Sequence, residues 1–215
     1  MTKPLRYIVI EGPIGVGKTS LARKLADDLK SDLLLEQAEE NPFLANFYQN
    51  PTQYALSTQL HFLLQRSQQV QNFRQNDLFK SSYIADFMVD KDRLFAEITL
   101  KQDELALYQQ IYQHVTLDAP KPDLVIYLQA PIEVLRSRIR QRGIDYEQQI
   151  RDDYLQRLSE SYTQFFYDYD EGPLLTVNTQ SVDLINDEAD YQSILEKIQN
   201  IHSGRHYFNQ SSFAI

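Results

Sequence analysis

Short runs of apolar residues alternate along the chain with longer stretches in which apolar residues recur at helical spacing. Five runs are expected to form β-strands, at residues 7–11, 33–36, 82–86, 124–128 and 174–178. Strands that are apolar throughout suit a parallel sheet covered on both faces, and the intervening helices provide the crossovers. The pattern therefore predicts an α/β fold with a five-stranded parallel, doubly wound sheet flanked by helices. Without repeats or linkers, residues 1–215 are expected to form a single domain.

The composition narrows the possible functions. The chain has 215 residues and a formal net charge of −9, a field that would repel a nucleic acid backbone over most of the surface. It contains no cysteine, which excludes disulfides, cysteine-ligated zinc and a thiol nucleophile, and its four histidines lack metal-ligand spacing. No apolar stretch resembles a signal peptide or a membrane span. We therefore expect a cytoplasmic protein that binds neither a nucleic acid polymer nor a membrane.

A glycine-rich segment follows the first expected strand and precedes a helical pattern, which is the order found around a P-loop. Glycines let successive backbone N–H groups turn toward phosphate oxygens, and the helix that follows directs its positive end at the same place. Lys18 adds a mobile positive charge, and the Thr19 hydroxyl can bind Mg²⁺. The residues expected to bind the nucleotide are the P-loop, 12–19, and the residue after it: Gly12, Pro13, Ile14, Gly15, Val16, Gly17, Lys18, Thr19 and Ser20.

Two acidic residues end expected strands, where doubly wound sheets bind their ligands. Glu36 ends the second strand, expected beside the P-loop strand, and is the candidate general base for a hydroxyl acceptor. Glu39 and Glu40 compete for that role, and a capping or surface position is the alternative for Glu36. Asp86 ends the third strand as a Walker-B-type acid would, which places a carboxylate near Thr19 to hold Mg²⁺; its alternative is a capping role.

A helical pattern that begins near Pro131 carries four arginines and then meets Gly143 and a polar stretch. In an acidic protein, such a cluster indicates a partner of opposite charge. Arg138 and Arg142 lie one turn apart on one helix face, so both guanidinium groups could reach one phosphate chain from a lid at about 138–150. The alternative is a solvated helix face paired with nearby carboxylates.

Further residues carry a resemblance to a known family. The region 42–75, expected to be mostly helical, contains Tyr48, Pro51, Gln59 and Arg66, and the lid follows at 138–148. In this spacing the chain resembles the deoxynucleoside kinase family over most of its length. The resemblance implies a P-loop kinase fold with an arginine lid. It also implies ATP and Mg²⁺ as cofactors, a homodimer, and transfer of phosphate to the 5′-hydroxyl of a deoxynucleoside in nucleotide salvage.

The resemblance implies roles for the residues of the acceptor pocket. Tyr48 and Glu147 would hold the 3′-hydroxyl of the sugar. Gln59 would present its amide to an edge of the base, Arg66 would belong to the same pocket, and Phe95 would stack on the base. A plain surface position on a helix is the alternative for Gln59 and for Arg66.

It also implies the catalytic set at the phosphate end. Glu36 would accept the proton of the 5′-hydroxyl, while Lys18, Arg138 and Arg142 would stabilise the charge on the phosphates. Ile144 stands where some relatives carry a third arginine, so two arginines would form the clamp.

One departure from the family pattern lies after the third strand. Many members carry an acid-Arg-Ser triplet there, but Phe87 replaces the arginine in this chain. A basic group, where one is needed, must come from Lys91 or Arg93. A register shifted by one residue leaves Asp92 as a possible base-reading partner for Arg66.

The acceptor is expected to be a purine deoxynucleoside, because the chain looks closer to bacterial deoxyadenosine and deoxyguanosine kinases than to thymidine-specific members. Deoxycytidine stays open, because a glutamine can pair with an adenine or a cytosine edge. One alternative is a nucleoside monophosphate kinase of the thymidylate type, which needs more basic residues than Arg66 and Arg74 in the region 42–75. Another is a nucleotide-switch binding module, but the Asn-Lys-x-Asp and Asp-x-x-Gly motifs are absent from the sequence.

Overall fold

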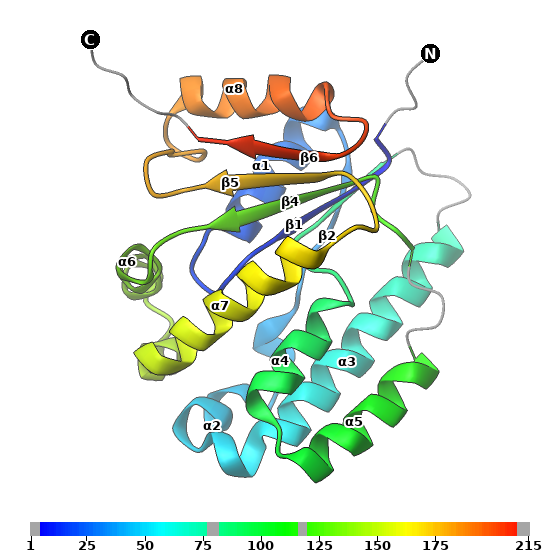
Figure 1. Ribbon diagram of the computed structural model, residues 1–215, viewed down its shortest axis with the longest axis vertical. Coiled ribbons are helices and arrows are strands. Elements are labelled where there is room, and N and C mark those ends of the chain that lie inside the picture. The colour runs from blue at the N-terminus through cyan, green and yellow to red at the C-terminus, as the bar shows by residue number, and fades with distance from the viewer. Residues whose placement is uncertain (1–4, 77–81, 116–119, 210–215) are drawn as a thin grey trace.

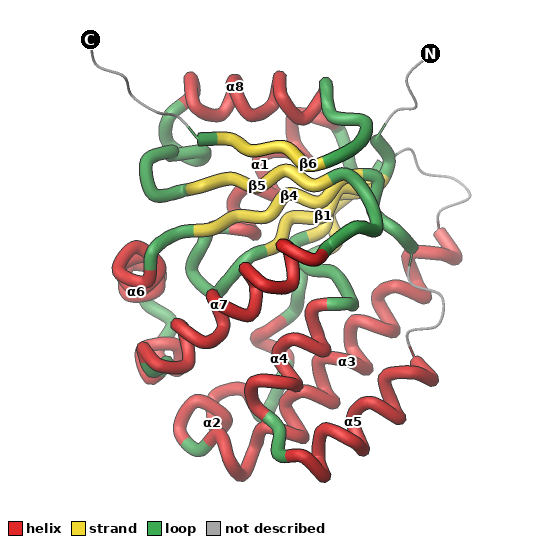
Figure 2. The backbone as a smooth tube through the Cα atoms, viewed as in Figure 1, coloured by secondary structure: helices red, strands yellow, loops and turns green. Residues whose placement is uncertain are grey.

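The computed structural model describes residues 5–76, 82–115 and 120–209, so the ends of the expected single domain lie outside the described residues. A parallel sheet lies between two layers of helices, which confirms the expected α/β class (Figure 1, Figure 2). The strands are β1 Tyr7–Glu11, β2 Asp32–Leu34, β3 Tyr83–Ala85, β4 Leu124–Gln129, β5 Leu174–Asn178 and β6 Arg205–Phe208. The α-helices are α1 Lys18–Leu29, α2 Leu44–Gln49, α3 Pro51–Asn76, α4 Lys91–Thr99, α5 Gln102–Val115, α6 Ile132–Arg142, α7 Asp152–Asp168 and α8 Glu188–Gln199, and short 3-10 helices are η1 Ala38–Glu40 and η2 Asp145–Gln149.

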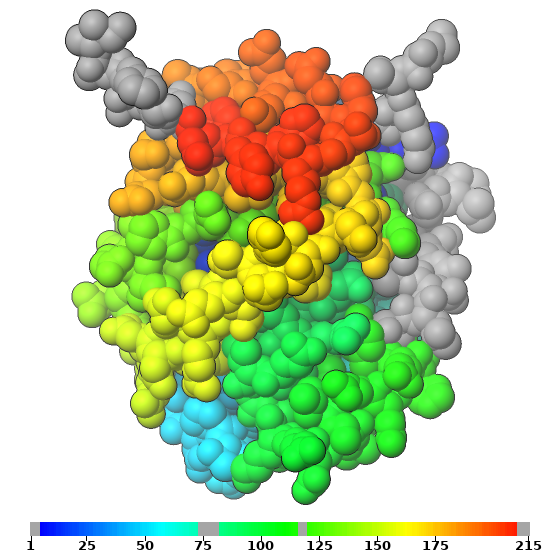
Figure 3. Space-filling view, viewed as in Figure 1, coloured from blue at the N-terminus to red at the C-terminus, as the bar shows by residue number. Residues whose placement is uncertain are grey.

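The described sheet has six strands, in the order β2-β3-β1-β4-β5-β6, so the expected number of five is wrong. The additional strand, β6, pairs in parallel with β5 and places Arg205 opposite Leu174. Its side chains are alternately exposed and half-buried, so it lacks the apolar run that marks the other strands. It lies beside the end of α7 at the surface in Figure 3, where the Arg205 guanidinium donates to the carbonyls of Phe166 and Tyr169.

The position of β2 also differs from the expectation. β3 lies between β1 and β2, so the strand that precedes Glu36 is not the neighbour of the P-loop strand. The burial of the two strands explains this order, because every residue of β3 is buried whereas those of β2 are half-buried or exposed. A fully buried strand suits the interior of a parallel sheet, and a partly exposed one suits its edge.

Alternate residues of β1 face two separate hydrophobic clusters. Ile8 and Ile10 pack with α1 and α8 on one face of the sheet, whereas Tyr7 and Val9 pack with α4 and α7 on the other. This period of two follows from the geometry of a β-strand. Both faces of the sheet are therefore covered, and its carboxyl edge stays open for ligands.

The region expected to be mostly helical forms α2 and the long helix α3. Buried Leu63, Ala96 and Tyr108 join α3 to α4 and α5, and Figure 2 shows these helices below the sheet. None of the helices in the described ranges has both the length and the apolar character needed to cross a bilayer.

Candidate active site

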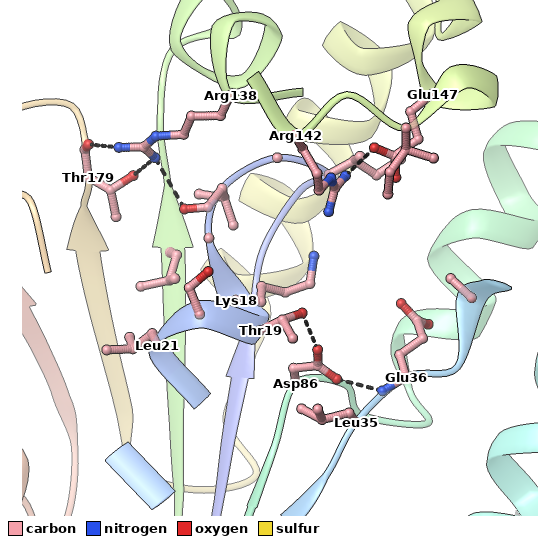
Figure 4. Close-up of a pocket in the computed structure, with 18 of the residues that line it drawn as sticks. Lys18, Thr19, Leu21, Leu35, Glu36, Asp86, Arg138, Arg142, Glu147 and Thr179 are labelled. Atoms are coloured by element: carbon pink, nitrogen blue, oxygen red, sulfur yellow. Dashed lines mark hydrogen bonds and ion pairs between the residues drawn. The ribbon is translucent and has the colours of Figure 1, made fainter. Parts of the chain in front are cut away.

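A cavity of about 1320 Å³ lies at the carboxyl edge of the sheet, where the strand ends meet the P-loop, α3 and the lid helix α6. Its volume exceeds the usual range for one small ligand, which leaves room for a phosphate donor and an acceptor together. The lining includes every expected site residue except Gly12 and Pro13 at the start of the P-loop. Figure 4 shows part of this lining, with residues of α1, α6 and η2 and of the segments after β2, β3 and β5 converging on one space.

The P-loop requires glycine where α6 packs against it. Gly15 has a φ of 84°, and a Cβ added there would lie 2.8 Å from the Leu135 carbonyl oxygen and from Ile139 Cγ1. Both atoms belong to the lid helix, so a larger residue would push α6 away or strain the loop. The absence of a side chain at Gly15 thus sets the distance between the lid helix and the P-loop.

Lys18 lies inside the P-loop. Its ammonium donates hydrogen bonds to the carbonyl oxygens of Gly12, at 2.8 Å, and Pro13, at 3.3 Å. Burial lowers the pKa of Lys18 to about 8, and the positive charge of Lys91 acts in the same direction. Phosphate oxygens in the loop would supply the negative charge that favours the protonated form.

The two expected metal ligands lie together. The Thr19 hydroxyl donates to Asp86 Oδ2, and the backbone N–H of Glu36 donates to Asp86 Oδ1 at 2.7 Å (Figure 4). A hydroxyl and a carboxylate at the P-loop form the hard oxygen set that Mg²⁺ prefers, usually completed by phosphate oxygens and water. The side chains present therefore fit a magnesium ion. Asp86 also fixes the backbone from which Glu36 projects.

Glu36 faces the cavity between two cations. Its carboxylate pairs with the Arg66 guanidinium, and the Lys91 ammonium lies 3.2 Å from Oε1 and 3.3 Å from Oε2. Its two competitors lie on η1 and are exposed. Glu40 accepts from side-chain amides of the neighbouring loop and α3, whereas Glu39 lines the cavity without a hydrogen bond within the described chain. The geometry thus sets Glu36 apart by its position beside Asp86 and by its charged neighbours.

The residues expected to contact a base also line the cavity. Arg66 forms a buried ion pair with Asp92, and its guanidinium lies 4.8 Å from the centre of the Phe62 ring. Burial lowers the pKa of Arg66 to about 10. Gln59 is buried in the same wall, and the half-buried ring of Phe95 also lines the cavity. Asp92 is thus the ion-pair partner of Arg66, and its part in reading a base stays a prediction.

Tyr48 and Glu147 come from distant parts of the sequence and line the same cavity. The ring of Tyr48 stacks on that of Tyr146 with centres 6.1 Å apart. Burial raises the pKa of Tyr48 well above its usual value, and the negative charge of Glu147 adds to this effect. Glu147 is itself largely buried and forms an ion pair with the Arg142 guanidinium, with 2.5 Å between Nη2 and Oε2.

The two lid arginines take different partners, although they lie one turn apart on α6. Arg138 donates to the carbonyl oxygens of Val16, at 3.1 Å, and Thr179, at 2.8 Å, and so connects the P-loop to the end of β5. Arg142 reaches toward Glu147 on the other side of the cavity (Figure 4). In this structure, the guanidinium groups therefore do not converge on one point.

Sequence reasoning did not single out Glu11, although it is the last residue of the P-loop strand. Its side chain is fully buried and accepts from the N–H groups of Gly12, at 3.1 Å, and Met88, at 2.8 Å, and from the Tyr162 hydroxyl at 3.0 Å. A carboxylate at the end of an otherwise apolar strand was the available signal. The Glu11 carboxylate connects the P-loop to the segment after β3.

Comparisons with known proteins find similar sequences and a similar fold. A family model described as deoxynucleoside kinase matches residues 8–203. The deoxyguanosine kinase of Bacillus subtilis (strain 168) is 34% identical over 200 residues, covering 91% of this chain and 97% of the relative. The deoxyadenosine/deoxycytidine kinase of the same organism is 26% identical, covering 90% of this chain and 92% of the relative. The solved structure of deoxyadenosine kinase from M. mycoides with bound dATP has a TM-score of 0.78 at 25% identity, covering 89% of this chain and 98% of that one.

Proposed function

The chain belongs to the deoxynucleoside kinase family, and on that premise we propose that it phosphorylates the 5′-hydroxyl of purine deoxynucleosides with ATP in nucleotide salvage. The observation that carries the proposal is the cavity itself. Lys18 and Thr19 of the P-loop line it together with Gln59 and Arg66 of α3. Glu36 connects the two groups, because its N–H donates to Asp86, the acceptor for Thr19, and its carboxylate pairs with Arg66. An acceptor bound beside Gln59 and Arg66 would present its hydroxyl past Glu36 toward the phosphates.

Each residue of the site has a separate role in the proposed reaction. The acceptor oxygen attacks the γ-phosphorus, its proton passes to the Glu36 carboxylate, and the bond from the γ-phosphorus to the β-phosphate oxygen breaks to release ADP. Lys18 and the P-loop N–H groups hold the phosphates. Thr19 and Asp86 would hold Mg²⁺, which would neutralise phosphate charge when bound. Arg142 would complete the positive surroundings from the lid.

The purine preference rests on the base pocket and on the relatives. Gln59 offers an amide donor and an acceptor, which match an adenine edge, and Arg66, held by Asp92, adds a charged group to the same lining. Two similar proteins from Bacillus subtilis are named deoxyguanosine kinase and deoxyadenosine/deoxycytidine kinase. Deoxycytidine is therefore the competing substrate. A nucleoside monophosphate is disfavoured, because Arg66 is already paired with Glu36 and Asp92.

A coupled assay of ADP release tests the proposal. We expect the purified chain to turn over ATP with deoxyadenosine or deoxyguanosine, with smaller kcat/KM values for deoxycytidine, thymidine and the ribonucleosides. Deoxynucleoside monophosphates should give no turnover. Activity with monophosphates and none with nucleosides would contradict the proposal and favour the thymidylate-type alternative.

The proposed contact between Tyr48, Glu147 and the 3′-hydroxyl gives a prediction about the sugar. A site built to bind a hydroxyl rejects an analogue without it, because its own polar groups stay unpaired. We expect 2′,3′-dideoxynucleosides to be much poorer substrates than deoxynucleosides. Tyr48→Phe should lower kcat/KM for the deoxynucleoside about tenfold and leave that for the dideoxynucleoside nearly unchanged.

Steady-state kcat/KM values for a deoxynucleoside and its 2′,3′-dideoxy analogue measure this difference in efficiency. Tyr54→Phe is the control, because Tyr54 packs in the same aromatic cluster but does not line the cavity. If the ratio of kcat/KM between the deoxynucleoside and the dideoxynucleoside is the same in Tyr48→Phe as in the wild type, Tyr48 is only a packing residue.

We also propose that the chain acts as one domain and as a homodimer. Leu64 of α3 and Leu107 of α5 expose 53% and 47% of their surfaces on two helices that contact each other. Large apolar side chains on adjacent exposed helices favour burial against a second copy. Light scattering of the purified chain distinguishes a dimer from a monomer.

A further inference from the structure

Lys91 is a buried cation at the start of α4. Only 2% of its surface is exposed, and its ammonium lies 3.6 Å from Glu11 Oε1 and 3.2 Å from Glu36 Oε1. Burying an ammonium is unfavourable unless carboxylates surround it. The fold therefore holds this charge at one point, between the end of the P-loop strand and the residue proposed as the base.

The other basic residue of this helix start lies elsewhere. Arg93 is exposed, and its guanidinium lies 5.9 Å from the centre of the Tyr112 ring on α5. Phe87, which stands at the place of the family's arginine, is fully buried and carries no charge. Within the described part of the chain, the cations in contact with Glu36 are thus Lys91 and Arg66.

Glu11 does not depend on Lys91 for its hydrogen bonds. Its two oxygens already accept from Gly12, Met88 and Tyr162. These three bonds fix Glu11 to the P-loop, to the segment after β3 and to α7. Glu11 therefore provides a rigid negative charge against which the Lys91 ammonium rests. Of the two carboxylates that contact Lys91, Glu36 is the one at the proposed reaction site.

We propose that Lys91 is a positioning residue: its ammonium, fixed by Glu11, orients the Glu36 carboxylate and supplies in this chain the positive charge that Phe87 lacks. Arg66 holds the same carboxylate from α3, so the two cations together restrict its rotation. Lys91 approaches from α4, on the side of Glu11 and the P-loop. This inference rests on the proposed function, because it takes Glu36 as the base.

Three variants test the inference. Lys91→Met keeps the length of the side chain and removes its charge, and we expect kcat with the best deoxynucleoside to fall about thirtyfold while KM changes less than about threefold. Lys91→Arg should recover a large part of the rate. Arg93→Met is the matched control on the same helix and should retain wild-type kcat.

The absence of cysteine allows a second test that does not depend on the stability of Lys91→Met. Lys91→Cys can be alkylated in the unfolded state with 2-bromoethylamine, which rebuilds an ammonium of nearly the same length, and then refolded. We expect this treatment to restore most of the kcat. The same variant treated with iodoacetamide, which adds a neutral group, should stay slow, and treated wild-type protein should be unaffected.

The outcomes separate the inference from the proposed function. A wild-type kcat in Lys91→Met would overturn the role of Lys91 and leave the kinase assignment intact. Lys91 would be only a structural residue under two conditions together: the fall in kcat of Lys91→Met matches the loss of folded protein seen by thermal melting, and aminoethylation of Lys91→Cys restores no activity. A wild-type chain that phosphorylates no deoxynucleoside would overturn the proposed function and this inference with it.

Discussion

Replacing Lys18 by alanine is expected to lower kcat by about a thousandfold or more while the melting temperature stays close to that of the wild type. The ammonium lies within the P-loop and donates to the carbonyl oxygens of Gly12 and Pro13. These contacts hold the charge where phosphate oxygens would bind, and the residue takes no part in a hydrophobic cluster. Its loss should therefore affect the transfer step much more than the fold.

The matched control for Lys18→Ala is Lys24→Ala on the same helix, α1. Lys24 pairs with Glu188 at 3.1 Å and lies 3.9 Å from the centre of the Tyr191 ring, away from the phosphate site. We expect its loss to lower the melting temperature slightly and to leave kcat unchanged. Turnover of ATP that survives in Lys18→Ala would contradict the assignment of the P-loop as the phosphate site.

The elements predicted well from the sequence are those specified by local pattern. β1 has the expected bounds, 7–11, because an apolar run meets the P-loop glycines at its end, and β5 has the expected bounds, 174–178. β6 was missed because Arg205 and His206 interrupt any apolar run, and the strand forms only through pairing with β5. The order of β2 and β3 is likewise a property of tertiary packing.

The residues of the site show the same difference between local sequence pattern and tertiary packing. Glu36 and Asp86 could be proposed from the sequence because strand ends mark the ligand edge of such a sheet. The choice between Lys91 and Arg93 was left open, because it depends on where α4 begins and which way each side chain points. The two lie two positions apart on the helix, so they face different neighbours. Only the fold brings one of them to Glu36.

The lid shows a second limit of sequence reasoning. Helical spacing correctly puts Arg138 and Arg142 on one face of α6, but it does not give the partner of each guanidinium. Arg138 bonds to Val16 and Thr179, and Thr179 follows β5, which lies far along the chain. Such contacts join segments that are brought together by the sheet, so no local pattern contains them.

Glu36→Gln tests the proposed base with the smallest change of shape. The amide keeps the size of the side chain and can still accept hydrogen bonds from Arg66 and Lys91, but it is a far weaker acceptor for the 5′-hydroxyl proton. Arg66 also keeps its ion pair with Asp92. We therefore expect kcat to fall about a hundredfold or more, while the dissociation constant of the deoxynucleoside changes only a few-fold.

The measurement combines steady-state kcat with nucleoside binding by calorimetry, so that loss of chemistry is separated from loss of affinity. Glu39→Gln and Glu40→Gln are the controls, because these carboxylates lie on η1 a few residues away and compete for the same role. Glu40 already accepts from Gln37 at 2.9 Å and Gln65 at 3.3 Å, and its loss should alter only this loop. An unchanged kcat in Glu36→Gln together with a large fall in Glu39→Gln would move the base to Glu39. Equal falls in kcat and in affinity for Glu36→Gln would make Glu36 a residue that binds the acceptor without taking its proton.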